Sequence, residues 1–253
     1  MKNLSIMLLS AIIAFSSCSQ NPYKRDVSDI SIEFSLLPFY TDILDLSTNF
    51  TETKRTELSK KYGLFFESFN SQILKIGVST DSLYATKLNT ILHDEWFSEL
   101  YKATNKQFNN TKELEEKLTE ALQYYKFYFP NNQIPRVCGF IGAVQYSVVL
   151  DSNMIAIGLD KYLGSNFEMY KQMEISSFIR RNMHAEKIPT DFMRAIVENE
   201  FPDAFTENYL LANMIQQGRY MYFVKSMLPN EADTLLWGYT SKQLEFCQKS
   251  ESE

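Results

Sequence analysis

The chain has 253 residues, of which 45% are hydrophobic and 14% aromatic, and this is ample material for one large core or two small ones. Its formal net charge is −6. A surface of that sign is poorly suited to nucleic acid, whose phosphates need clustered Lys and Arg, so no nucleic-acid partner is expected.

Residues 1–17 have the pattern of a signal peptide. Lys2 supplies a basic start, and the apolar run that ends at Phe15 is shorter than the roughly 20 residues of a spanning helix. Two serines then precede Cys18, as in a bacterial lipobox, although Phe15 stands where Leu is usual. We therefore expect Cys18 to be acylated and residues 18–30 to form a polar tether. The alternative is a plain secretory signal with an incidental cysteine.

An acylated cysteine places the protein in the cell envelope, facing the periplasm from the inner or the outer membrane. Two or three acyl chains make such an anchor effectively permanent. The compartment permits a disulfide between Cys138 and Cys247. Because Cys138 lies in an apolar run, a buried free thiol is the simpler interpretation. With two further histidines and no paired spacing, the sequence does not indicate a metal site.

The apolar periodicity predicts helices first, then strands, then helices again. The expected helices are residues 52–74, 81–103, 110–130, 188–202, 206–229 and 238–253, and the expected strands are residues 134–141 and a hairpin over 144–164 that turns at 151–153. This order predicts an α+β fold, mostly helical with a small central antiparallel or mixed sheet, in one domain over residues 31–253.

Individual residues predict where some of these helices begin. Asn110 and Thr190 are expected to cap two of them, and Thr240 with Gln243 forms a capping box. The apolar side chains of residues 206–229 are expected to face the core; they are Leu210, Leu211, Met214, Ile215 and Tyr222. The last helix has barely two turns of apolar content, which suggests either a chain that is truncated at its C-terminus or a frayed tail.

A hairpin followed by a helix is the arrangement of zinc peptidases, in which the helix carries two histidines one turn apart. His93 and His184 do not begin such a motif. The positions of the first ligand, the base and the second ligand are taken by Arg194, Ala195 and Glu198, and the first and last of these form a simple i,i+4 ion pair. Zinc chemistry is therefore not expected.

Other catalytic classes lack their motifs as well. The sequence has no nucleophile elbow for a serine hydrolase and no glycine-rich phosphate loop, so no cofactor is expected. The carboxylate pairs Glu198/Glu200 and Glu174/Glu186 would suit a glycosidase in principle, but solvated helix faces explain them more simply.

Two further features indicate contact surfaces. Arg180 and Arg181 lie between apolar positions and would suit a partner's carboxylates, with a solvated turn as the plainer interpretation. The aromatic run of residues 124–129 has rings on every face of a helix end, so part of it is expected in the core and part in an interaction patch.

Three motifs in this order resemble the gliding motility lipoprotein GldB family of Bacteroidetes-type bacteria. They are "IGLDKYLG" at 157–164, "IRRNM" at 179–183 and "GRYMYFVKSMLP" at 218–229. The resemblance covers roughly residues 20–250, and the lipobox agrees with it independently. Family members usually continue for some tens of residues past "QLEFCQK", which is a second reason to expect a truncated chain.

The resemblance implies a lipoprotein required for gliding and linked to the type IX secretion machinery, whose envelope proteins would be its partners. It carries no catalytic residue onto this chain. It also implies a distant likeness to zincin-type peptidases, with this chain on the inactive side.

We therefore expect the hairpin to present an edge to a protein partner. Asp160, Tyr162 and Gly164 match the family motif, and they are expected to face the surface and contact that partner. The alternatives are an envelope hydrolase of the peptidase type and a lipid-tethered protein that binds a small ligand.

Overall fold

A computed structural model describes residues 21–151, 154–202 and 209–250. Its first half comprises β1 (Leu36–Leu37), α2 (Phe39–Thr48), α3 (Glu52–Tyr62), α4 (Leu64–Ser68), a π-helical turn (Phe69–Ile73), α5 (Tyr84–Leu92), α6 (Glu95–Gln107) and α7 (Lys112–Tyr128). Its second half comprises β2 (Arg136–Phe140), β3 (Val148–Asp151), β4 (Met154–Gly158), α8 (Glu168–Gln172), α9 (Ser177–Arg180), α10 (Ile188–Glu200), α11 (Leu210–Met227), α12 (Asp233–Trp237) and α13 (Ser241–Ser250), with single 3₁₀ turns at Leu159–Lys161 and Ala185–Lys187.

The described strands form one mixed sheet in the order β1-β2-β4-β3. β1 and β2 are parallel, β2 and β4 are parallel, and β3 and β4 form an antiparallel hairpin. The α+β fold with a small mixed sheet is thus confirmed. β3 lies at one edge of the sheet and is paired with β4 only.

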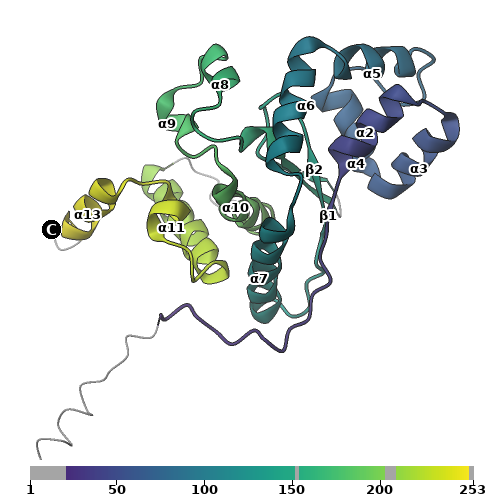
Figure 1. Cartoon of the computed structure of the whole chain (residues 1–253). Helices are drawn as coiled ribbons and strands as arrows, with labels where there is room; N and C mark the ends of the chain where they lie inside the picture. Colours follow the sequence, from purple (N-terminus) through teal and green to yellow (C-terminus); the bar gives the residue numbers. More distant parts are fainter. Residues whose placement is uncertain (1–20, 152–153, 203–208, 251–253) are drawn as a thin grey trace, which may run out of the picture.

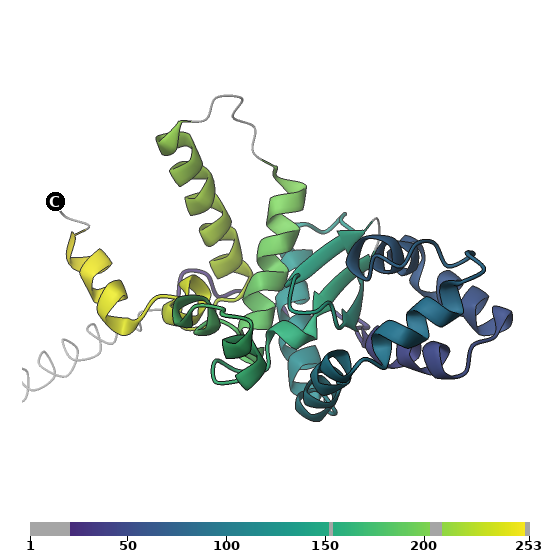
Figure 2. The ribbon, with the colours of Figure 1, turned by 90° about the horizontal axis from the view of Figure 1, so that it is seen from above.

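Helices cover both faces of this sheet (Figures 1 and 2). Helices α2 to α6 gather on one side, and α10 packs on the other side, against β3. α10 in turn contacts α7 and α11. Figure 2 shows α10 between the sheet and α11, so this helix connects the sheet to the C-terminal part of the chain.

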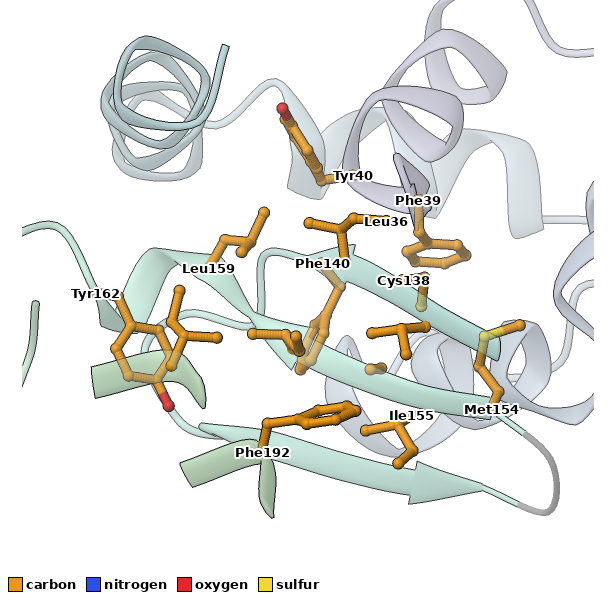
Figure 3. Close-up of a cluster of buried hydrophobic side chains, with 14 of the residues drawn as sticks. Leu36, Phe39, Tyr40, Cys138, Phe140, Met154, Ile155, Leu159, Tyr162 and Phe192 are labelled. Carbon is orange, nitrogen blue, oxygen red and sulfur yellow. The ribbon is translucent and has the colours of Figure 1, made fainter. Parts of the chain in front are cut away.

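The core is rich in aromatic rings, which lie on both faces of the sheet (Figure 3). Phe39, at the start of α2, is fully buried and meets Tyr62, Phe65 and Phe69 edge to face, with centroid distances of 4.7–5.0 Å. Such T-shaped pairs add to the hydrophobic gain of burying the rings. On the other face, Phe192 of α10 covers the sheet. Phe39 therefore joins α2, α3, α4 and the π-helical turn that follows α4.

The connection from β2 to β3 has to cross the end of β4, because β4 lies between these two strands. Residues 141–147 make this crossing, and a side chain at Gly158 would collide with the carbonyl of Tyr146. Ala143 and Val144 adopt positive φ angles of 55° and 62°, which is uncommon for residues with a side chain. The loop is therefore held in a conformation that the local sequence does not favour.

Several expected helices are shorter than the sequence pattern indicated. Residues 52–74 divide at Gly63, which has φ of 62°. Residues 81–103 divide at Asp94, whose side chain caps α6 by accepting from the backbone N–H of Trp96. A continuous apolar stripe does not reveal such breaks, because two consecutive helices can bury the same stripe.

The capping residues were predicted with mixed success. The capping box of Thr240 and Gln243 is confirmed by three hydrogen bonds. Thr190 as a cap is wrong, because α10 already begins at Ile188 with Pro189 in its first turn, where a proline is tolerated. Asn110 lies one residue before the N-cap Thr111, although its side chain accepts from the N–H of Lys112.

The prediction that the apolar stripe of α11 faces the core is wrong. Gln216, Tyr220, Phe223, Val224 and Met227 fill the buried face instead. The predicted stripe lies on the opposite face, where the exposed fraction is 67% for Leu211 and 65% for Tyr222. α11 is apolar on both faces, and sequence periodicity could not decide which face turned inward.

The N-terminal segment lies along the domain. The side-chain amide of Asn21 donates to the carbonyl of Pro229, and the hydroxyl of Tyr124 donates to the carbonyl of Arg25. Gln123 of α7 donates to the carbonyl of Ile30. The described part of the expected tether is thus fixed on α7 and on the loop that follows α11.

Phe39→Ala is expected to lower the free energy of unfolding by about 3–5 kcal/mol, because it removes a buried ring and leaves a cavity among three others. Urea unfolding followed by circular dichroism measures this. Leu64→Ala is the matched control, since Leu64 is mostly exposed, and it should change stability by less than about 0.5 kcal/mol. Equal losses for both variants would contradict the central position of Phe39.

Candidate functional site

A cleft of about 570 Å³ lies between one end of the sheet, where β2 and β4 begin, and the last turns of α10. Its walls come from segments that are far apart in the sequence. They are residues 133–136, the hairpin residues Leu150, Met154 and Ile155, and the α10 residues Ile196, Asn199 and Glu200. No sequence pattern predicts this assembly, because only the fold brings the three segments together.

The edge strand β3 contributes Leu150 to this cleft. Its second edge has no strand partner among the described residues, so it offers backbone N–H and C=O groups to an extended chain. Leu150, whose exposed fraction is 37%, lies where β3 meets the cleft. The arrangement suits the addition of a strand from another protein, with an apolar side chain of that strand against Leu150.

Polar residues of the cleft are held in place by the rest of the domain. The carboxylate of Glu200 accepts from the hydroxyl of Tyr125 and from the amide of Asn132. The guanidinium of Arg136 donates to the carbonyl of Lys61 at 2.7 Å. The rim of the cleft is therefore already organised without a ligand.

Helix α10 carries the residues at which the sequence spacing would put the ligands of a zinc peptidase. Arg194 and Glu198 form the expected i,i+4 ion pair, with Nε and Oε1 at 2.7 Å, and Arg194 also donates to Gln217 of α11. Within residues 21–151, 154–202 and 209–250, no three His, Cys, Asp or Glu side chains gather as a metal site would need.

The side chain of Asp160 holds the loop that crosses the end of β4. Its carboxylate is fully buried and accepts from the backbone N–H of Gly142 at 3.2 Å and of Val144 at 2.7 Å. Burial raises its pKa to about 6, and the two N–H donors oppose this shift. Tyr170 donates its hydroxyl to the carbonyl of the same residue at 2.6 Å.

A second polar network joins the family motif to α10. Tyr162 is buried and donates its hydroxyl to Asp191 at 2.8 Å. The ammonium of Lys187 lies 4.0 Å from Asp191 and donates to the carbonyls of Leu235 and Leu236. Burial raises the pKa of Asp191, and Lys187 opposes the shift. These contacts fix α10 against the turn after β4 and against α12.

The expectation that Asp160 and Tyr162 face the surface is therefore wrong. Both side chains are buried and serve the interior of the domain. Gly164 is partly exposed, with φ of 100° and its N–H bonded to the carbonyl of Met183. Only a glycine adopts that conformation readily, so its role in the turn is also conformational.

The two adjacent arginines lie on a partly exposed turn. Arg180 donates to the carbonyls of Ile175 and Ser165, and Arg181 donates to the carbonyl of Gly238. Arg181 also lies over the ring of Phe178, at 5.3 Å from its centroid. Both guanidinium groups thus support loops, and their contact with a partner stays a prediction.

The remaining residues singled out in the sequence divide between core and surface. Cys138 is a buried free thiol and Cys247 an exposed one, as the simpler interpretation predicted. Tyr124 and Tyr125 are buried, whereas Phe127 and Tyr128 are exposed, which confirms the expected division of the aromatic run. The carboxylate oxygen Oε2 of Glu186 lies 2.8 Å from Nδ1 of His184.

A groove of about 660 Å³ lies between the C-terminal ends of α7 and α10 and the face of α11. Aromatic residues dominate its walls, among them Phe129, Phe201, Tyr220, Tyr222 and Phe223. Sequence reasoning missed this groove, because it assigned Tyr222 to the core.

Comparison with known proteins identifies one family. The family model described as gliding motility protein GldB, whose label designates a lipoprotein, matches residues 20–253. No curated protein and no solved structure matches the chain. In the part of the chain that the structure describes, none of the helices combines the length and the apolar character needed to cross a membrane.

The free energy of unfolding is expected to depend on pH through Asp160. The folded carboxyl keeps its proton up to about pH 6, whereas the ordinary value is 3.8, so the folded state binds more protons between these values. The contribution of the Asp160 carboxyl to the free energy of unfolding is fully present below about pH 4. It declines by up to about 3 kcal/mol as the pH rises to about 6.

Asp160→Asn removes this titration. The variant is expected to be less stable than the wild type. The amide of asparagine would bring its own N–H donors close to the N–H groups of the loop, which need acceptors. The difference between the two proteins should be largest near pH 4 and smaller near pH 7. Urea unfolding at several pH values measures it, with the exposed Asp29→Asn as control. A difference that does not change with pH would refute the assignment.

Proposed function

Because the chain belongs to the GldB family of gliding motility proteins, we propose that it is a lipid-anchored, non-catalytic envelope protein that supports gliding and type IX secretion through contacts with other proteins. The family match over residues 20–253 supports the role in gliding. Cys18 is the proposed site of the lipid, and it lies outside the described residues.

One observation carries the non-catalytic part of the proposal. At the sequence positions where the spacing would put the ligands of a zinc peptidase, this chain has Arg194 and Glu198, which form an ion pair with each other. A guanidinium cannot bind a metal cation, because it has no lone pair to donate. The alternative of an envelope hydrolase is therefore less well supported, since the helix beside the cleft carries no such ligand set.

The free edge of β3 and the adjoining cleft support the contact with proteins. An extended segment of an envelope protein would continue the sheet beyond β3 and place alternate side chains toward α10. Arg180, Arg181 and Gly164 lie on a separate turn and are proposed as a secondary contact. Asp160 and Tyr162 would act only by shaping the fold.

The third possibility, a tethered protein that binds a small ligand, is favoured by one observation. The groove between α7, α10 and α11 is apolar and has the size of a small-molecule site.

Cys18→Ser is expected to release the protein from the membrane fraction, because each acyl methylene that is no longer buried forfeits about 0.8 kcal/mol. Gliding and cargo secretion should be lost with it in cells that carry only the variant. Fractionation of the cells and motility assays measure the two effects. Cys247→Ser is the control and should change neither. Retention of Cys18→Ser in the membrane fraction would refute the anchor.

Leu150→Lys is expected to reduce gliding and secretion, because it places a charge where the partner strand would bury an apolar side chain. The melting temperature and the membrane fraction should stay unchanged, since Leu150 is half-exposed. Leu64→Lys is the matched control, on an exposed leucine of α4 that does not line the cleft. Normal gliding and secretion with Leu150→Lys would contradict the use of this edge.

A further inference from the structure

The exposed face of α11 carries an apolar stripe that the domain does not use. Leu211, Met214, Ile215 and Tyr222 recur at helical spacing on this face, and Gly218 between them leaves it flat. Their exposed fractions range from 45% to 67%. The stripe extends over about 16 Å, from the rise of 1.5 Å per residue. The opposite face of α11 is the one that packs on the domain.

The stripe is continuous with the apolar groove. Tyr222 belongs to both, and Phe201, which is also exposed, lines the groove from the end of α10. An exposed apolar surface of this extent, on a helix that already has a buried face, marks a place where something else docks.

The path of the N-terminal segment indicates what docks on the stripe. The first described residue, Asn21, is bonded to Pro229, two residues beyond α11, and the ring of Tyr23 meets the ring of Tyr222 edge to face at 5.7 Å. Cys18 is three residues before Asn21, and three residues of fully extended chain span at most about 11 Å. An acyl chain on Cys18 would therefore hold the membrane surface beside the end of α11.

The side chains around the stripe suit a membrane surface. The stripe itself carries no charge, and a tyrosine stands at its end nearest the tether, as at many membrane interfaces. Two exposed cations flank it, Lys24 beside Tyr23 and Arg219 one turn before Tyr222. An amphipathic helix with this pattern lies in the interface with its apolar side chains among the acyl chains.

We propose that the α11 stripe lies on the lipid bilayer to which the chain is tethered, so that the anchored domain has one fixed orientation on the membrane. This inference rests on the proposed lipid anchor at Cys18. The lipid and the stripe would act as two signals for one surface, since each restricts the domain to the position that the other favours.

The test uses the full-length lipidated protein in vesicles of phosphatidylethanolamine and phosphatidylglycerol. Cys247→Ser removes the exposed native thiol, and a fluorophore sensitive to polarity is attached at Leu211→Cys or at Ile215→Cys. Leu64→Cys is the matched control, because it is as exposed as Leu211 but lies in the helical group on the other side of the sheet. Flotation of the vesicles reports the anchor, and quenching by nitroxide lipids reports the position of the label.

We expect the labels at Leu211 and Ile215 to shift to the blue and to be quenched several-fold more than the label at Leu64. Met214→Lys should abolish most of the quenching at Ile215, whereas Leu83→Lys should leave it unchanged. Protein that floats with the vesicles while all labels report water would overturn the docking of α11 and leave the anchor intact. Protein that does not float would overturn both proposals. Burial of the label only in a dimer, without quenching by lipid, would show that a second copy covers the stripe.

Discussion

The passage of residues 141–147 across the end of β4 is the constraint on which the rest of the structure depends. β2 and β4 are parallel neighbours, so the chain can reach the outer strand β3 only by passing over β4. The crossing needs a glycine at position 158 and a buried acceptor for the loop's N–H groups, which Asp160 supplies. Ionised carboxylates are rarely buried without a cation, and here backbone donors take the cation's place. A carboxylate that is otherwise costly to bury thus holds the hairpin at the edge of the sheet.

The same turn after β4 also fixes α10. Tyr162, two residues after Asp160, reaches Asp191, and Lys187 links the first turn of α10 to the end of α12. The motif at 157–164 that carries the family resemblance therefore forms buried contacts that connect the sheet to α10. Its residues determine where the cleft lies, although none of their side chains needs to touch what enters the cleft.

The sequence was informative where burial follows a single periodicity and misleading where two faces compete. The hairpin, α7 and the mixed α+β architecture follow from such patterns, as does the buried thiol of Cys138. β1 and α2 were not predicted, because Leu36–Leu37 is too short to show a strand pattern and α2 follows it directly. α11 was oriented wrongly, since apolar residues lie on both of its faces and only the packing of Phe223 and Val224 against the domain decides between them. The cleft was beyond prediction, because it joins residues 133–136, the hairpin and the end of α10.

The order of layers relates the two proposed contact surfaces. α10 packs on β3 on one side and on α11 on the other, and the stripe lies on the far face of α11, so the sheet and the α11 stripe are separated by the thickness of two helices, about 20 Å. A domain that rests on the membrane through α11 would therefore hold β3 about two helix diameters above the membrane surface. A partner segment that joined the sheet there would have to be extended and to reach this height above the membrane. The ion pair of Arg194 and Glu198 lies on the helix between these surfaces, and Arg194 also donates to Gln217, which ties α10 to α11.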